Sequence, residues 1–339
     1  MLFLSIETSC DETAAAIFDD ERKILASVVA SQLQQHTRFG GVVPEVAARA
    51  HLTQLLPVID AALHEAGVAL SDVGAVAVMN TPGLVGALLV GVSAAKMLAV
   101  ALDVPLFAVN HIEAHIYACR LAAGREIFPC VGLVVSGGHT ELFHCRSPLD
   151  FQPLGGTIDD AAGEAFDKVA ALLELGFPGG PAVERRAANG NSKAFALPRA
   201  FLHETRLDFS FSGLKTAVRY LIRDLTASGI ALTADQKADV AASFQQAVID
   251  VLIAKCKLAL ERTGLDTLAV GGGVTANASL RRALEAFAAR EDLALVIPPP
   301  ALCTDNAAMA ALAIELWKEG RSAPLDLDAE PRWSQTRAR

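Results

Sequence analysis

The chain has few aromatic residues and no excess of basic charge. Phe, Trp and Tyr make up 6% of its 339 residues, and 29 Lys and Arg stand against 38 Asp and Glu, for a formal net charge of −9. An acidic chain repels nucleic acid on average, so RNA binding would need a local basic patch or a basic partner. The candidates are Arg185-Arg186, Arg281-Arg282 and the tail from Arg332 to Arg339. Each of these clusters, taken alone, is typical of an ordinary solvated surface.

Closely spaced cysteine pairs are also absent. The six cysteines, at positions 10, 119, 130, 145, 256 and 303, include no C-x-x-C pair. Such scattering is typical of reduced thiols in a cytoplasmic protein. The first residues, MLFLSIETSCDE, have no basic segment and turn acidic at Glu7, which argues against a secretory signal peptide. We therefore expect a cytoplasmic location.

One hydrophobic run, LVGALLVGVSAAKMLAVAL at residues 84–102, is long enough to cross a bilayer. Lys96 lies well inside it, and Gly86, Gly91, Ser93 and Ala94 give it small side chains. These features favour a buried helix that packs against a sheet, and we expect no membrane association.

The composition favours a two-domain α/β protein. Hydrophobic residues make up 52% of the chain and charged residues 20%, and a prior of about 150 residues per domain gives two domains. Residues 2–18 and 131–145 each read as strand, polar turn, strand. Short buried strands are predicted at 75–80, 105–110, 268–270 and 294–297. Two similar openings about 130 residues apart indicate a duplicated α/β unit.

Residues 150–250 are predicted to form a mostly helical insertion in the second half. Thr157 or Asp159 is a plausible N-cap of its first helix, and Thr233 of its last. The segment DNAAMAALAIELW near the end of the chain is expected to form a helix that returns to the first lobe. The resulting domain prediction has a first lobe of residues 1–117 with 304–325, a second lobe of residues 118–303, and a tail of residues 326–339.

The sequence HIEAH, residues 111–115, follows the predicted strand PLFAVN. Two histidines four residues apart lie on one face of a helix, and Asn110 is a plausible N-cap. A zinc protease of the HExxH type has glutamate directly after the first histidine, whereas this chain has Ile112 there. At roughly 100° per residue, Glu113 points away from the histidine face. The pattern therefore permits a metal site and argues against a protease.

Asp305, in LCTDNAAMAA, is the strongest candidate for a third metal ligand. It follows a predicted strand and a proline-rich turn, at the start of a helix. Its alternative role is to cap that helix. Two histidines and one carboxylate suit Fe(II) or Zn(II), with coordination positions left open.

Several small or polar turns are candidate ligand sites. AVGGGVTANASL (269–280) reads as strand, Gly-rich turn and helix, which favours an anion or a nucleotide, and Asn277 within it has an amide able to bond a ribose or base. VVSGGHT (134–140) lies in the turn of the second strand pair, and PGGP (178–181) forms a rigid turn. Asp167 is unusual inside a helix, where a solvated position is as reasonable as a polar contact. Asp11 and Glu12 lie in the first turn. Their carboxylates either hold a metal, orient a nucleophile or simply make a good turn.

Eight segments occur in one order across nearly the whole chain: SIETSCDET, HIEAH, VVSGGHTEL, GGTIDDAAGEAFDKVA, FPGGP, FSFSGLKT, VGGGVTANASLR and CTDNAAMAA. Together they closely resemble the bacterial tRNA N6-adenosine threonylcarbamoyltransferase family (TsaD), formerly described as O-sialoglycoprotein endopeptidases. The resemblance implies a duplicated α/β fold of the actin/Hsp70/sugar-kinase type (ASKHA, RNase H-like), with two lobes around a nucleotide cleft. It also implies transfer of a threonylcarbamoyl group from threonylcarbamoyl-AMP to N6 of adenosine 37 in tRNAs that read ANN codons.

The resemblance also implies site residues and partners. Carried over by motif, the metal ligands are His111, His115 and Asp305, for one divalent ion per subunit, Fe²⁺ or else Zn²⁺. The adenylate-binding residues are Val134, Val135, Ser136, Gly137, Gly138, Asp167, Gly180, Glu184 and Asn277; some family members have Asp at the position of Glu184. Asp11 and Glu12 are candidates for proton removal from N6. Bacterial members work with a paralogous subunit (TsaB) and a small ATPase (TsaE).

Three alternatives have their own sequence requirements. A metalloprotease needs a glutamate beside the first histidine. A small-molecule kinase of the same fold needs acids for Mg²⁺ and has no use for HIEAH. A non-catalytic scaffold subunit would lack the metal ligands, whereas all three candidates are present.

Overall fold

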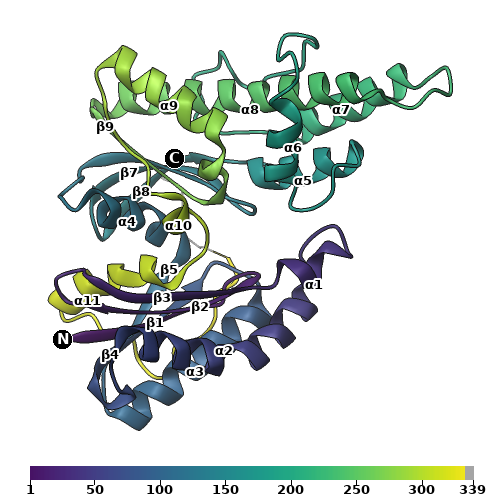
Figure 1. Ribbon diagram of the computed structural model, residues 1–339. Coiled ribbons are helices and arrows are strands. Elements are labelled where there is room, and N and C mark those ends of the chain that lie inside the picture. Colours follow the sequence, from purple (N-terminus) through teal and green to yellow (C-terminus); the bar gives the residue numbers. More distant parts are fainter. Residues whose placement is uncertain (333–339) are drawn as a thin grey trace. The chain divides into compact units, whose positions relative to one another are not determined.

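The computed structural model describes residues 1–332 and divides into two compact units, each built on a five-stranded sheet (Figure 1). Unit 1 comprises residues 1–126, 147–151 and the described residues from 301 onward, and unit 2 comprises residues 127–146 and 152–300. The lobe boundary expected at 117 falls inside a continuous helix, α4 (His111–Ala123). Residues 333–339, in the expected tail and the basic cluster at the C-terminus, lie outside the described residues.

The sheet of unit 1 has the strand order β3-β2-β1-β4-β5. The central strand β1 pairs antiparallel with β2 and parallel with β4, and β4 pairs parallel with β5. The strands are β1 (Leu2–Glu7), β2 (Glu12–Asp19), β3 (Ile24–Ser31), β4 (Val73–Thr81) and β5 (Leu106–Asn110). The predicted strand–turn–strand opening and both later strands are confirmed.

The sheet of unit 2 repeats this order as β8-β7-β6-β9-β10. Its central strand β6 pairs antiparallel with β7 and parallel with β9, as β1 does with β2 and β4. The strands are β6 (Cys130–Val135), β7 (Thr140–Ser147), β8 (Asp150–Gly156), β9 (Thr267–Gly271) and β10 (Ala294–Val296). The predicted duplication is therefore confirmed. Strand β8 occupies the start of the region expected to be mostly helical, because its proline and two glycines obscure the strand pattern in DFQPLGG.

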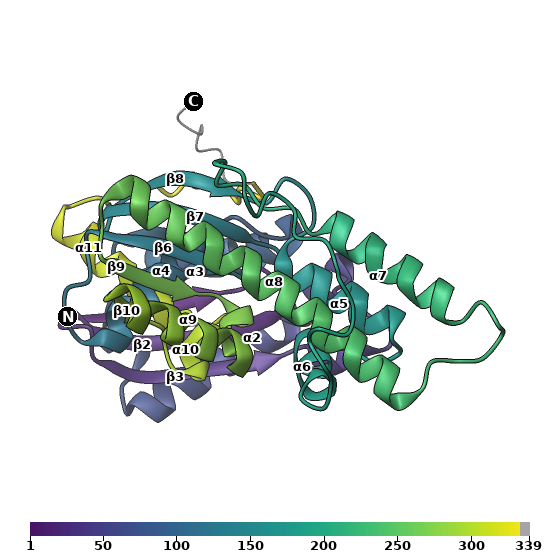
Figure 2. The same cartoon turned by 90° about the horizontal axis from the view of Figure 1, so that it is seen from above.

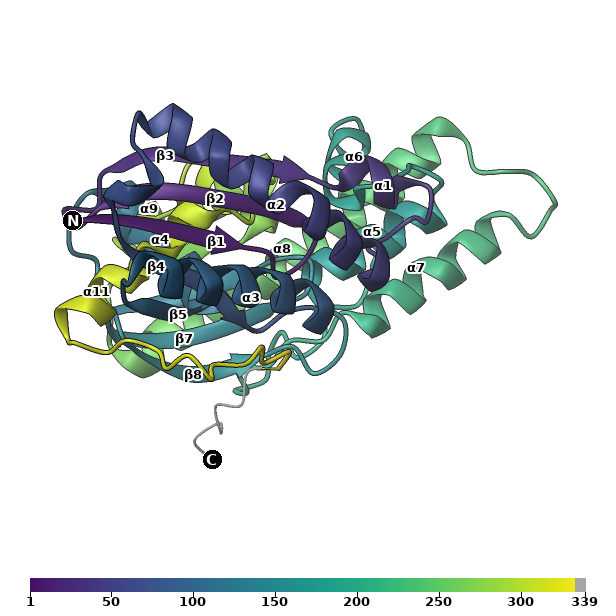
Figure 3. The same ribbon diagram turned by 90° about the horizontal axis from the view of Figure 1, so that it is seen from below.

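Helices cover both faces of the sheet in unit 1. Successive side chains of β1 point to opposite faces of the sheet, so Phe3 lies on one face and Leu4 on the other. Leu4 packs with α2 (Pro44–Ala66) and α3 (Val85–Leu102), which lie side by side over that face (Figure 3). Phe3 packs on the opposite face with α4, η3 (Ala307–Leu312) and α11 (Ala313–Lys318). The segment DNAAMAALAIELW thus lies in unit 1, as predicted. Shorter elements are α1 (Leu33–Thr37), η1 (Leu70–Asp72) and α10 (Pro300–Cys303).

Helix α3 is the one described helix that is long and apolar enough to cross a membrane, with a mean hydropathy of 2.1 over 18 residues. It packs against the sheet of unit 1 through small residues. At Gly91 the backbone lies so close to β1 that a Cβ would stand 2.3 Å from Thr8 Oγ1. The predicted packing of this run as a helix against a sheet is confirmed.

Unit 2 carries the long helical region. Figure 2 shows α8 lying over the sheet, and α7, which precedes it in the chain, leading to the loop that returns into α8. The helices are α5 (Ala162–Leu172), α6 (Gly179–Ala187), α7 (Ser212–Leu225), α8 (Ala234–Thr263), η2 (Gly273–Ala276) and α9 (Ala278–Glu291).

The predicted N-cap of α8 is confirmed, because Thr233 forms a capping box with Gln236. Neither Thr157 nor Asp159 caps α5, whose N-cap is Ala161. Thr140 Oγ1 accepts a hydrogen bond from Ala162 N instead, at 2.9 Å. The Asp159 carboxylate accepts bonds from Ser210, Phe211 and Ser212, at the start of α7.

Candidate metal centre and candidate adenylate site

The two histidines of HIEAH lie at the start of α4, directly after β5. Asn110 caps this helix, as predicted, because its Oδ1 accepts hydrogen bonds from Ile112 N at 2.8 Å and Glu113 N at 3.3 Å. The cap fixes the first turn, so the two imidazoles project from one face, with ring centroids 4.7 Å apart. This position at the carboxyl end of a strand is where sites form in α/β sheets.

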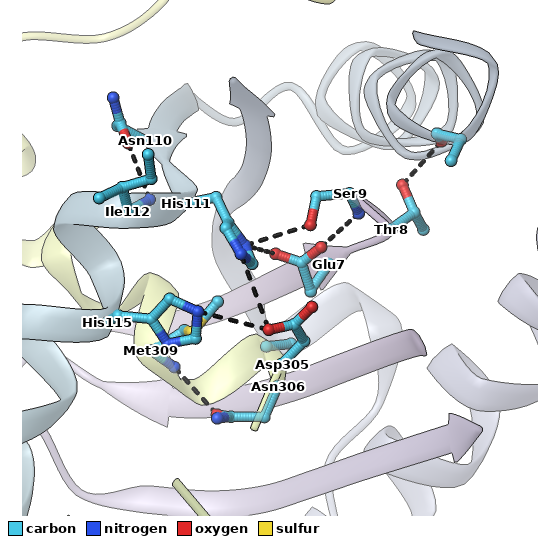
Figure 4. Close-up of polar contacts among 12 residues, drawn as sticks. Glu7, Thr8, Ser9, Asn110, His111, Ile112, His115, Asp305, Asn306 and Met309 are labelled. Atoms are coloured by element: carbon cyan, nitrogen blue, oxygen red, sulfur yellow. Dashed lines mark hydrogen bonds and ion pairs between the residues drawn. The ribbon is translucent and has the colours of Figure 1, made fainter. Parts of the chain in front are cut away.

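The carboxylate of Asp305 meets both histidines (Figure 4). Asp305 Oδ1 lies 3.3 Å from His115 Nε2 and 3.7 Å from His111 Nε2. One ligand atom from each of the three residues lies within 4.8 Å of the others. Both histidines are buried, and neither His115 nitrogen has a hydrogen-bond partner among the described residues, despite the short distance to Asp305. Converging nitrogen and carboxylate donors with an unsatisfied imidazole fit a divalent metal ion.

The electrostatics of the pair also fit a cation. Burial alone would lower the pKa of His111, but the carboxylates of Asp305 and Glu7 raise it to about 9. Burial lowers the pKa of His115, and the nearby Asp305 carboxylate only partly opposes this. The carboxylates around His111 therefore favour positive charge at this site, and a bound cation would supply that charge in place of the imidazole proton.

Asp305 does not serve as a helix cap, which was its alternative role. The N-cap of η3 is the next residue, Asn306, whose Oδ1 accepts from Met309 N at 3.2 Å (Figure 4). The Asp305 carboxylate is directed instead to the histidines.

Glu113 has its own surroundings. Burial raises its pKa to about 7, and Arg321 is the charged group that opposes this shift. It is not among the residues that gather at the histidines, in agreement with the helical geometry expected from the sequence.

Asp11 ends the turn between β1 and β2, and Glu12 is the first residue of β2. Burial raises the pKa of both carboxyl groups, that of Glu12 to about 7. Glu12 Oε1 accepts a hydrogen bond from Ser31 Oγ at 2.9 Å, whereas its buried Oε2 has no partner among the described residues. The charge of Asp305 contributes to both upward shifts, so these two carboxyl groups and the candidate metal centre share one electrostatic environment in unit 1.

Val134 and Val135 end strand β6, and Ser136, Gly137 and Gly138 form the turn after it. Ser136 N donates to His139 O at 2.8 Å, so this N–H is already bonded within the turn. The N–H groups of Gly137 and Gly138 have no acceptor among the described residues, and a Cβ on either glycine would meet nothing within 4 Å. The two glycines therefore keep an open backbone surface that suits an anion.

The other candidate adenylate-binding residues, Asp167, Glu184 and Asn277, each make a polar contact within unit 2. Asp167 Oδ1 accepts a bond from Gly179 N at 2.7 Å, which places the start of α6 on α5 beside Gly180. Glu184 Oε1 accepts from Ala278 N at 2.7 Å, next to Asn277. Asn277 caps α9 and donates to Gln245 Oε1 at 2.7 Å. The observed contact of Asp167 favours the polar role over the solvated one.

Three turns of unit 2 also approach each other through glycine. A Cβ on Gly163 of α5 would lie 2.5 Å from Ser136 O, and one on Gly272 would lie 2.4 Å from Val135 O. Gly272 has a φ of +94°, which L-residues rarely adopt. The turn after β6, the start of α5 and the turn after β9 therefore lie against one another within unit 2.

Sequence reasoning missed Glu7 and Ser9, both of which contact His111. Glu7 Oε2 lies 3.0 Å from His111 Nδ1, and Ser9 Oγ lies 3.1 Å from the same nitrogen (Figure 4). A signal was present in the strand LFLSIE, because Phe3, Ser5 and Glu7 alternate onto the face that α4 and η3 cover. Two polar residues on a buried face indicate specific partners.

Comparisons with known proteins agree with these motifs. The family model described as tRNA N6-adenosine threonylcarbamoyltransferase matches residues 23–312. A protein of that name from Rhodopirellula baltica is 52% identical over 97% of this chain and 96% of its own length. One from Halalkalibacterium halodurans is 50% identical over 97% of this chain and 95% of its own length.

Solved structures share the fold at low sequence identity. Full-length HypF in a phosphate- and nucleotide-bound form has a TM-score of 0.63 and 15% identity, over 95% of this chain and 56% of that chain. Component A of (R)-2-hydroxyglutaryl-CoA dehydratase from Acidaminococcus fermentans has a TM-score of 0.53 and 14% identity, over 92% of this chain and 96% of that chain. The duplicated ASKHA-type α/β fold is thereby confirmed, and the chain belongs to the tRNA N6-adenosine threonylcarbamoyltransferase family.

Proposed function

We propose that this enzyme transfers a threonylcarbamoyl group from threonylcarbamoyl-AMP to N6 of adenosine 37 in tRNAs that read ANN codons. A bond forms between N6 and the carbamoyl carbon, the bond from that carbon to the phosphate oxygen breaks, and AMP and one proton leave. The relatives named as transferases support this reaction over the kinase and metalloprotease alternatives.

The observation that carries the proposal is the convergence of His111, His115 and Asp305 in unit 1. These three side chains would hold a divalent metal ion, Fe²⁺ in preference to Zn²⁺. When bound, such an ion supplies Lewis-acid polarisation of a carbonyl oxygen. A protease of the HExxH type would lack its general base, because Ile112 follows the first histidine.

The residues of unit 2 are proposed to bind the adenylate. The open N–H groups of Gly137 and Gly138 would donate to its phosphate and stabilise the charge that develops on the leaving group. Gly180, Glu184 and Asn277 would contact the nucleoside, with Asp167 holding the start of α6 in place. The adenylate site would also be lined by the backbone of Val134, Val135 and Ser136. The Ser136 N–H would not donate to the phosphate, because it is already bonded to His139 O.

Glu12 is proposed as the group that accepts the proton from N6. Its pKa of about 7 places it near the working pH of a general base, and its Oε2 has no partner among residues 1–332. Asp11 would assist through its charge, which contributes to raising the pKa of Glu12.

The proposed partners are tRNA, a paralogous subunit of the TsaB type and a small ATPase of the TsaE type, with a cytoplasmic location. Partners would supply part of the tRNA surface, since the chain carries a net charge of −9. Two basic candidates are already engaged in the fold, because Arg281 donates to Pro298 O and Arg282 to Ser279 Oγ.

A reconstitution tests the function. The protein is mixed with both partner subunits, threonine, bicarbonate, ATP, the adenylate-forming enzyme and an unmodified ANN-reading tRNA. We expect N6-threonylcarbamoyladenosine in the digested tRNA for the wild type, and at least a hundredfold less for His111→Ala and Asp305→Ala, by mass spectrometry. Product at wild-type level in both variants would remove the metal centre from the mechanism. No product from folded, metal-loaded wild type would refute the function.

A further inference from the structure

Glu7 is a fully buried carboxylate at the end of strand β1, in the motif SIETSCDET. Oε2 lies 3.0 Å from His111 Nδ1, and Oε1 accepts a short hydrogen bond from Ser9 N. Burial of an unpaired carboxylate is costly. A glutamate whose two oxygens both have partners inside unit 1 is therefore held in a defined orientation against His111.

The two nitrogens of His111 face different groups. Nε2 faces Asp305 Oδ1 at 3.7 Å, and Nδ1 faces Glu7 at 3.0 Å and Ser9 Oγ at 3.1 Å (Figure 4). A neutral imidazole carries one proton, and the hydrogen bond at one nitrogen decides which nitrogen is free to coordinate. A carboxylate at Nδ1 favours the proton there and leaves the Nε2 lone pair directed to His115 and Asp305.

The second histidine is held differently. His115 Nδ1 is buried and has no hydrogen-bond partner within the described part of the chain. Ligating histidines usually donate their other N–H to a carboxylate, a carbonyl or water, and these contacts also fix the ring orientation. Of the two histidines, His111 has such a carboxylate contact, between its Nδ1 and Glu7.

We propose that Glu7 is a positioning residue of the metal centre. It keeps His111 in the tautomer that is protonated at Nδ1, with Ser9 beside it, and thereby sets Nε2 as the ligand atom. This inference rests on the proposed function only in that the three side chains bind a divalent metal; it does not depend on the reaction catalysed.

The test measures metal binding rather than transfer. Zn²⁺ affinity of the full chain is determined by competition with a chromophoric chelator, for the wild type and Glu7→Gln. We expect a loss of about 10- to 100-fold, since removal of such a carboxylate typically has this effect. Ser9→Ala, a milder change at the same nitrogen, is expected to lose affinity by less than Glu7→Gln and to remain measurable if Glu7→Gln does not fold.

Thr8→Val is the matched control. Thr8 lies between Glu7 and Ser9 and is equally buried, but its Oγ1 donates to Ala87 O of α3 at 2.9 Å (Figure 4). Its substitution removes a buried hydrogen bond from the same segment without touching His111. We expect its Zn²⁺ affinity to stay within about threefold of the wild type, whatever its melting temperature.

A second readout is the His111 tautomer, observed by long-range ¹H–¹⁵N spectra of the Zn²⁺-loaded wild type. The positioning role is supported if the wild type has the His111 tautomer that is protonated at Nδ1 and if this tautomer is lost or less populated in Glu7→Gln. A protonated Nε2, an unchanged affinity in folded Glu7→Gln, or an equal loss in Thr8→Val would overturn it. The affinity and tautomer measurements contain no tRNA. Their outcomes therefore do not depend on whether the transferase assay succeeds.

Discussion

Asp11 and Glu12 are adjacent in the sequence, yet their carboxyl groups have different surroundings. Glu12 begins strand β2 and accepts from Ser31 Oγ, while burial and the charges of Asp11 and Asp305 raise its pKa to about 7. A carboxyl group with this pKa is half ionised near neutral pH, which suits general base catalysis.

The rate of transfer is expected to follow the ionisation of Glu12. In single-turnover assays with loaded substrate, the wild-type rate should rise with pH and level off above about pH 7, and Glu12→Gln should lose 100-fold or more. A second variant, Ser31→Ala, tests the same assignment through the pKa of Glu12. The Ser31 hydrogen bond lowers the pKa of Glu12, so its removal should move the midpoint of the profile to higher pH. An unchanged profile in both variants would exclude Glu12 as the base.

Glu12 also affects stability in a direction that can be checked. Its pKa is higher in the folded state than the ordinary value of 4.5, so its favourable contribution is present below about pH 4.5 and is lost as the pH rises through 7. Because the group is partly exposed, Glu12→Gln should be more stable than the wild type at pH 8 by only about 1 kcal/mol. Denaturant unfolding at pH 8 and pH 4.5 measures this difference.

At the scale of elements, the contact between α3 and β1 depends on a glycine. Gly91 lies over the end of β1, and Thr8 Oγ1 occupies the space where a Cβ would stand, while donating to Ala87 O. The helix therefore lies close to the strand that carries Glu7.

Gly91→Ala should destabilise the protein although alanine is the better helix former. The added methyl group would stand 2.3 Å from Thr8 Oγ1, and overpacking of this kind costs about 1–3 kcal/mol. Gly213→Ala is the matched control, because Gly213 lies in α7 and its Cβ would meet nothing within 4 Å. It should be neutral or slightly stabilising, by up to about 0.5 kcal/mol. Equal changes in the urea midpoints of both variants would contradict this account of the contact.

At the scale of the whole molecule, α2 and α3 expose apolar side chains although they cover the sheet of unit 1. Ala48 of α2 and Gly86 of α3 approach closely, so the two helices form one surface. The apolar strip consists of the exposed residues Leu52, Leu56, Val85, Leu89, Met97 and Val100. Exposed apolar surfaces of this kind mark protein or membrane contacts, and we expect the paralogous TsaB-type subunit to bind here.

A charge in the strip should prevent that association. Leu52 and Ile230 are each 69% exposed, but Ile230 lies in the loop between α7 and α8 of unit 2. Leu52→Asp is expected to weaken binding of the paralogous subunit at least 100-fold in sedimentation or chromatography, whereas Ile230→Asp should bind as the wild type does. Flotation of the isolated wild-type chain with lipid vesicles would instead favour a membrane contact.

The sequence alone determined the fold class, the duplication and the three candidate metal ligands, which the structure brings together. Alternation of apolar residues predicted most strands, the four-residue spacing of His111 and His115 placed them on one helix face, and Asn110 marked the start of that helix. These features are local, because they depend on the periodicity of one element and on its cap.

Only the tertiary structure decided what each of these residues contacts. Asp305 reaches the histidines because Asn306, and not Asp305, caps η3. Glu7 contacts His111 across 104 positions of sequence, and the Ser136 N–H is taken by His139. Such partners are set by the packing of distant segments, and strand β8 was missed because its pairing with β7 outweighs the weak strand propensity of proline and glycine.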